Sequence, residues 1–111
     1  MTADRFRTLA LSLPEAVELL HMCHPDFRVG GKIFATLWED LAHGMVKLTP
    51  AEQTEFVRAM PKVFQPLKGA WGARGCTQVV LKTATKSSLW PALVCAWKNV
   101  APDRLVREWK D

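Results

Sequence analysis

The first apolar positions of the chain repeat with a helical period. Phe6, Leu9, Ala10 and Leu13 are spaced at i, i+3, i+4 and i+7, which places them on one face of a helix. Pro14 ends the pattern, because the residue before a proline is disfavoured in the α conformation. The spacing therefore predicts an amphipathic helix that lies on a core.

Extended runs follow this helix. Residues 15–22 include β-type side chains and predict a short strand. The runs 27–29 and 32–38 are separated by Gly30-Gly31, and two glycines accept the positive φ angles of a tight hairpin turn. The run 43–48 continues the same antiparallel meander.

The second half of the chain alternates between helical and extended patterns. Thr49 is an N-cap, Pro50 stands at the first helical position and Glu52 completes a capping box, which predicts a helix to about Met60. The remaining elements are expected in the following order: a short strand at Val63-Phe64, a glycine-rich loop over residues 66–75, a strand over residues 76–82, a long helix capped by Ser88 with Pro91 in its first turn, and a terminal helix from Pro102.

This order of elements predicts an α+β fold. We expect one domain over residues 1–111, with helices at the N-terminus, in the middle and at the C-terminus packed on one face of an antiparallel meander. The opposite face of such a two-layer domain is partly open, and a binding surface could form there. Trp97 and Trp109 share helical spacing with leucines and valines, which predicts that both are core residues.

Composition narrows the class of protein. The three cysteines are odd in number and form no Cys-x-x-Cys pair, so we expect reduced thiols rather than a disulfide framework or a zinc ribbon. Neither a secretory signal nor an apolar stretch of about 20 residues is visible. We therefore expect a soluble, cytoplasmic monomer that holds no cofactor and has no membrane partner.

The distribution of charge is more informative than the net charge of +4. Residues 1–60 hold six Lys or Arg against eight Asp or Glu, whereas residues 61–111 hold nine against three. No acidic residue occurs between Glu55 and Asp103. If the bases of this segment share one face, they attract phosphates, whereas scattered bases are only a solvated surface. Both interpretations remain open at this stage.

Three segments carry a family resemblance. The run HMCHPDFRVGGKIFATL at residues 21–37, together with GAWGARGCT at 69–77 and AWKNVAPDRL at 96–105, resembles the MmcQ/YjbR-like family over nearly the whole chain. The resemblance implies a compact α+β fold of the kind compared with CyaY and with secretion chaperones. Proteins of this family are often named DNA-binding proteins, on the basis of a proposed double-wing surface of β-hairpins, so the resemblance implies DNA binding. It implies no agreed catalytic activity.

Two groups of residues are candidate binding sites for nucleic acid. Arg28 and Lys32 flank the Gly30-Gly31 turn and could form a basic wing tip that neutralises phosphates. Trp71 stands beside Arg74 in a glycine-rich segment and either stacks on a base or closes the edge of the core. The full set of predicted nucleic-acid contacts is Arg28, Lys32, Lys68, Trp71, Arg74, Lys82 and Lys86.

A third group is a weak candidate for a metal or thiol site. His21, Cys23 and His24 are possible ligands, with His43 or Cys76 as a fourth, but their spacing matches no standard site. The alternative is a structural turn in which His24-Pro25 leads into the hairpin. No catalytic motif is present, so we expect no enzymatic activity.

Three functions follow from these patterns. The leading hypothesis is a non-enzymatic domain that binds double-stranded DNA or another polyanion through the basic hairpin and the basic C-terminal half. The alternative is a protein- or peptide-binding module that uses the open sheet face and Trp71. The third is a metal-dependent or thiol enzyme at His21, Cys23 and His24.

Overall fold

A computed structural model describes residues 1–21 and 24–110, and of His21 it describes only the backbone. The chain begins with the predicted amphipathic helix, α1 (Ala3–Leu11). The hydroxyl of Thr2 accepts a hydrogen bond from the Arg5 amide at 3.1 Å and so caps its first turn. The predicted apolar positions Phe6, Leu9 and Ala10 are its buried residues.

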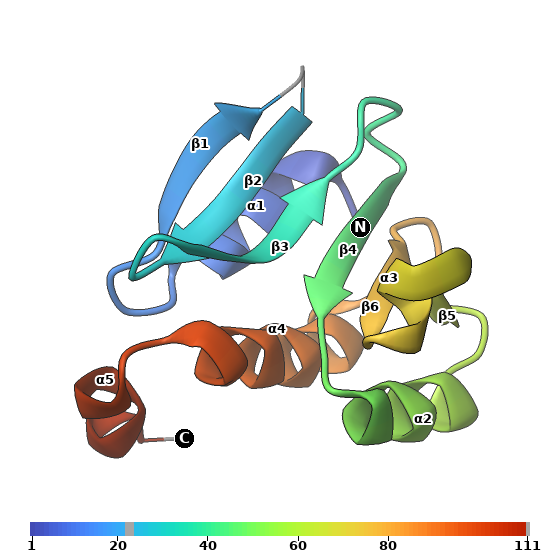
Figure 1. Ribbon diagram of the computed structural model, residues 1–111. Helices are drawn as coiled ribbons and strands as arrows, with labels where there is room; N and C mark the ends of the chain where they lie inside the picture. The colour runs from blue at the N-terminus through green and yellow to red at the C-terminus, as the bar shows by residue number, and fades with distance from the viewer. Residues whose placement is uncertain (22–23, 111) are drawn as a thin grey trace.

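All the strands pair in one antiparallel sheet (Figure 1). They are β1 (Val17–His21), β2 (His24–Val29), β3 (Lys32–Leu37), β4 (His43–Lys47), β5 (Phe64–Pro66) and β6 (Cys76–Val80). Their order in the sheet is β1-β2-β3-β4-β6-β5. The first four strands are the predicted meander, and β6 then lies between β4 and β5. Consequently β1 and β5 are the two edges.

The β2–β3 hairpin turns at the predicted glycines. Gly30 and Gly31 have φ angles of +59° and +79°, which residues other than glycine rarely adopt. Gly30 also lies against the ring of Pro102, where an added Cβ would be 3.2 Å from two ring carbons. The turn is therefore packed against the C-terminal segment rather than projecting freely into solvent.

The helix α2 (Pro50–Ala59) has the predicted capping box. Thr49 Oγ1 accepts a hydrogen bond from the Glu52 amide at 3.2 Å, and the Thr49 amide donates to Glu52 Oε1 at 2.9 Å. The backbone amides of Thr49 and Glu52 have no acceptor within the helix, and each is bonded by the side chain of the other residue.

Two predictions about the C-terminal half were wrong. Residues 66–75 are not a loop throughout, because α3 (Gly69–Ala73) forms within them. The long helix α4 (Lys86–Val100) is capped by Thr85 rather than by Ser88. Ser88 is the third residue of the helix, and its hydroxyl accepts a hydrogen bond from the Thr85 amide at 2.8 Å. The helix therefore starts earlier than predicted, and Pro91 lies beyond its first turn. The terminal helix α5 (Asp103–Glu108) follows Pro102 as expected.

The helices α1 and α4 cover one face of the sheet, and α1 lies behind β2 and β3 in Figure 1. The buried apolar residues form one continuous cluster. Trp97 is fully buried in it, and its indole Nε1 donates to the carbonyl of Pro14 at 3.0 Å. The α+β prediction is confirmed, with α1 and α4 on one face of the meander. Within the described residues, none of the helices is long and apolar enough to span a membrane.

Candidate functional site

Arg28, a predicted phosphate contact, forms an ion pair with the carboxylate of Asp26. Asp26 and Arg28 are two residues apart on β2 and so lie on the same face, away from the helices. Arg28 Nε donates to Asp26 Oδ1 at 2.9 Å and Nη2 donates to Oδ2 at 3.0 Å. The hydrogen bond to Asp26 raises the pKa of the Arg28 guanidinium. Asp26 is only 2% exposed, so Arg28 neutralises a buried carboxylate.

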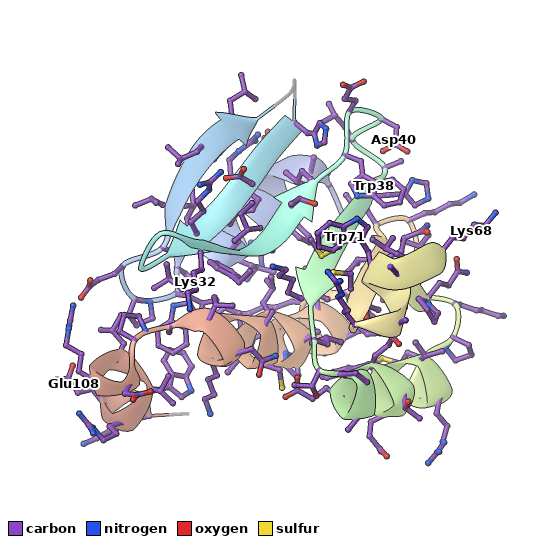
Figure 2. The ribbon with its side chains drawn as sticks, viewed as in Figure 1. Lys32, Trp38, Asp40, Lys68, Trp71 and Glu108 are labelled. Carbon is purple, nitrogen blue, oxygen red and sulfur yellow. The ribbon has the colours of Figure 1, made fainter. Side chains whose placement is uncertain are left out.

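The other predicted bases lie in separate parts of the molecule. Lys32 is at the hairpin and Lys68 is beside α3, at opposite ends of the view in Figure 2. Lys82 follows the end of β6 that is farther from α3, and Lys86 lines a cavity with Arg5 and Trp90 between α1 and α4. The structure therefore does not bring the predicted set together on one surface.

Trp71 and Arg74 do form a local cluster. Trp71 is 58% exposed, and the Arg74 guanidinium carbon lies 5.5 Å from the centroid of its ring. In Figure 2 Trp71 lies over β4 on the open side of the sheet. The prediction left the exposure of this tryptophan undecided, and the structure shows that it is exposed.

A cavity of about 310 Å³ connects this cluster to two other elements. Lys47 at the end of β4 and Asn99 near the end of α4 line it together with Trp71, Arg74 and Cys76. We call Lys47, Trp71, Arg74, Cys76 and Asn99 the Trp71 site. It combines an exposed aromatic ring with two cations, a set that can hold a planar ring joined to an anion.

The two cations of the Trp71 site surround the Cys76 thiol. Burial raises the pKa of the Cys76 thiol, while the charges of Lys47 and Arg74 act in the opposite direction. Both cations therefore lie within electrostatic reach of one sulfur atom. The carboxylate of Glu52 adjoins the cavity, where its Oε1 accepts from Asn99 Nδ2 at 2.8 Å and from the Thr49 amide at 2.9 Å.

Hydrogen bonds between distant parts of the chain hold α3 in place. Gln53 Nε2 on α2 lies within 3.1–3.2 Å of the carbonyls of Gly72 and Cys76 and of the Thr77 hydroxyl. The hydroxyl of Thr77 donates in turn to the Gly75 carbonyl at 2.8 Å. This network positions the short helix that carries Trp71, which would not be stable by itself.

The sequence did not indicate Lys47 or Asn99 as site residues. Lys47 is opposite Cys76 in the β4–β6 register, and Asn99 Nδ2 donates to the Lys47 carbonyl at 3.1 Å. These contacts join residues that are about 30 to 50 positions apart. No local sequence pattern encodes such pairing, so Lys47 and Asn99 could be identified as site residues only from the tertiary structure.

One of the weak metal candidates, His24, lines a second cavity. His24 lines it with Trp38, Glu39 and Asp40, whereas Cys23 and the side chain of His21 lie outside the described residues. Among the residues that the structure describes, no group of three or more His, Cys, Asp or Glu is arranged to hold a metal ion. His43 and Cys76, considered as a fourth ligand, are at opposite ends of the β4–β6 ladder.

Asp40 organises the loop between β3 and β4. Its Oδ1 accepts from the amides of Ala42 and His43, at 2.9 and 3.1 Å, and its Oδ2 lies 2.6 Å from His43 Nδ1. Trp38 packs on the His43 ring, with centroids 5.4 Å apart. The hydrogen bonds from Ala42 and His43 hold the pKa of Asp40 below its usual value.

We expect Asp40→Asn to remove a stabilisation that depends on pH. Because the pKa of Asp40 is lowered by folding, its contribution is fully present above about pH 4 and is lost as the pH falls through the folded value. The side chain is 47% exposed, so solvent screening limits the effect to at most about 1 kcal/mol. Urea unfolding at neutral and at acidic pH should show that wild type and variant converge in acid. A difference that grows in acid would contradict this account.

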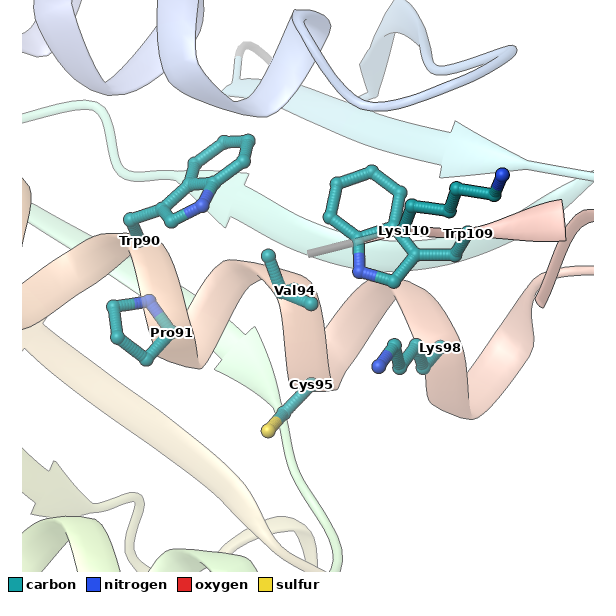
Figure 3. A pocket seen from close by; sticks show the side chains of 7 residues that line it. All are labelled: Trp90, Pro91, Val94, Cys95, Lys98, Trp109 and Lys110. Carbon is teal, nitrogen blue, oxygen red and sulfur yellow. The ribbon is translucent and has the colours of Figure 1, made fainter. Parts of the chain in front are cut away.

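A larger cavity of about 470 Å³ lies between α4 and the C-terminal segment (Figure 3). Trp90 and Trp109 line it, with ring centroids 6.4 Å apart, together with Val94 and Lys98. Trp109 also packs on the buried ring of Trp97 at 5.4 Å. These tryptophans attach the C-terminus to α4, so their aromatic surface is largely explained by packing.

Comparisons with known proteins agree with this architecture. The crystal structure of Deinococcus radiodurans protein DR2400, with a DUF419 domain, is similar with a TM-score of 0.75 at 20% sequence identity. The similarity covers 96% of this chain and 86% of that chain, and at this identity it shows the fold alone. A comparison with curated proteins gives no match. The YjbR family model matches residues 11–109, and the chain therefore belongs to the YjbR family.

Proposed function

We propose that this chain is a non-enzymatic domain that binds nucleic acid through the Trp71 site. The observation that carries the proposal is the exposed Trp71 ring with Arg74 beside it and Lys47 in the same cavity. Tryptophan stacks on bases of any sequence, and nearby Arg and Lys neutralise phosphates. The proposal includes a cytoplasmic location, for which the odd number of cysteines is the support.

The geometry favours single-stranded over duplex nucleic acid. A base can stack on Trp71 only if it is unpaired or at an end, whereas a groove-binding wing would need free cations at the hairpin. Arg28 is already engaged by Asp26, and the Gly30 turn is packed against Pro102. We therefore place the contact at the Trp71 site rather than at the hairpin.

The test is fluorescence anisotropy with a labelled single strand of about twenty thymidines, and with a duplex of the same length, at several salt concentrations. Trp71→Ala should weaken single-strand binding by about 5- to 150-fold, which corresponds to roughly 1–3 kcal/mol for one stacked base. Trp71→Phe should retain most of the affinity. Lys47→Gln and Arg74→Gln should each reduce the salt slope by about one phosphate contact.

Matched controls are available elsewhere on the chain. Lys32→Gln and Lys82→Gln remove one positive charge each, but neither residue lines the cavity of the Trp71 site. Their effect on affinity should be smaller than that of Lys47→Gln. The proposal fails if wild-type protein does not bind the single strand at low salt, or if Trp71→Ala binds as wild type does.

A further inference from the structure

The two edges of the sheet differ in how they are protected. An edge strand presents unpaired amides and carbonyls, and proteins usually shorten it, charge it or place proline in it. β5 has three residues and contains Pro66, so it presents a short and interrupted edge. β1 has five residues and no proline, and in Figure 1 it forms the outer border of the sheet.

The side chains of β1 are apolar on both of its faces. Val17 and Leu19 are on the open face and are 51% and 48% exposed, while Leu20 is on the helix face and is 74% exposed. Glu18 is bound by Arg7 Nε, which donates to its two carboxylate oxygens at 2.9 and 3.1 Å. Within Val17–Leu20, therefore, the one charged side chain is neutralised from α1.

We propose that β1 pairs with β1 of a second copy of this chain, antiparallel and about a two-fold axis at Leu19. A two-fold axis perpendicular to the sheet can pass through Glu18, Leu19 or Leu20, because facing residues must lie on the same side. An axis at Glu18 would place two carboxylates opposite each other, which is destabilising. An axis at Leu20 would pair only residues 19–21 of the two strands. An axis at Leu19, the middle residue of Val17–His21, pairs all five residues of β1, with leucine opposite leucine and Glu18 opposite Leu20.

The position of the helices allows this pairing. α1 lies behind β2 and β3 rather than beyond β1, so the edge is open to an incoming strand (Figure 1). Pairing joins two six-stranded sheets edge to edge and keeps the helices of both copies on the same face. The Trp71 site is on the opposite half of the sheet and stays accessible in the dimer.

The dimer is expected to be weak. One short strand buries less than the roughly 1,200–2,000 Å² of a standard interface, so we expect the dimer to form only at high protein concentration. The sequence alone predicts a monomer. The strand order changes that expectation.

The first test is sedimentation velocity of the full chain from about 5 µM to about 1 mM. Wild type should shift from monomer to dimer in this range, and Leu19→Lys should raise the dissociation constant at least about tenfold. Leu41→Lys is the matched control, because Leu41 is 57% exposed on the β3–β4 loop and should leave dimerisation unchanged. Circular dichroism verifies that both variants are folded.

The second test measures the register. Leu19→Cys should form a disulfide with itself under mild oxidation, and Leu20→Cys should do so more slowly because its partner in this register is Glu18. Faster cross-linking at position 20 would overturn the register. A wild-type monomer at every concentration would overturn the proposal and leave the edge for a strand of another protein. Equal loss of dimer in Leu19→Lys and Leu41→Lys would overturn it as well.

Discussion

Gly75→Ala should lower the free energy of unfolding by about 3–4 kcal/mol. An added Cβ would be 1.9 Å from the carbonyl oxygen of Leu48, and the φ angle of +109° is rarely adopted by other residues. The Gly75 carbonyl also accepts from the Leu48 amide at 3.3 Å and from Thr77. A backbone shift here would break these contacts and move the turn between Arg74 and Cys76. We therefore expect lost single-strand binding as well as lost stability.

Gly69→Ala is the matched control for this prediction. Gly69 also has a positive φ, of +75°, but an added Cβ there would meet no atom within 4 Å. Its cost should be limited to the backbone strain, about 1 kcal/mol. Urea unfolding of both variants isolates the effect of close packing at Gly75. Equal losses in the two variants would show that the approach of Leu48 to Gly75 contributes nothing.

Trp97→Ala should lower the free energy of unfolding by about 3–5 kcal/mol. Trp97 is fully buried, packs on Trp109 and donates from Nε1 to the Pro14 carbonyl at 3.0 Å. Its removal leaves a large cavity between α4 and the segment after α1, and it leaves the Pro14 carbonyl without its donor. The Trp97 ring therefore contacts both the segment after α1, at Pro14, and the C-terminal segment, at Trp109.

Trp97→Phe separates the two contributions. Phenylalanine fills much of the volume but cannot donate a hydrogen bond, so we expect a loss of about 1–3 kcal/mol. Thermal and urea unfolding measure both variants, and Trp90→Phe serves as a partly exposed aromatic control that should cost less. If Trp97→Phe is as damaging as Trp97→Ala, the hydrogen bond rather than the packing dominates.

The local elements of this fold could be predicted from sequence because their signals are contained within a few residues. Gly30-Gly31 identified a hairpin, Thr49 and Glu52 identified a helix start, and the apolar period from Phe6 identified the first helix. The same approach missed α3, because glycine at positions 69 and 72 is unfavourable in a helix without tertiary support. That support comes from Gln53, whose amide reaches the Gly72 carbonyl.

The candidate site could be predicted only in part, for the same physical reason. Trp71 and Arg74 are three residues apart, so the sequence indicated their cluster. Lys47 joins it only because β6 enters the sheet beside β4, and Arg28 pairs with Asp26 because folding buries that carboxylate next to it.

The sequence by itself therefore determined the α+β class and most helices and strands, since these follow from spacing, turns and caps, and its resemblance to known sequences indicated the family. The tertiary structure alone decided which cations converge and that β1 is an exposed edge. Contacts between residues far apart in the chain depend on strand order and burial, which no local pattern contains.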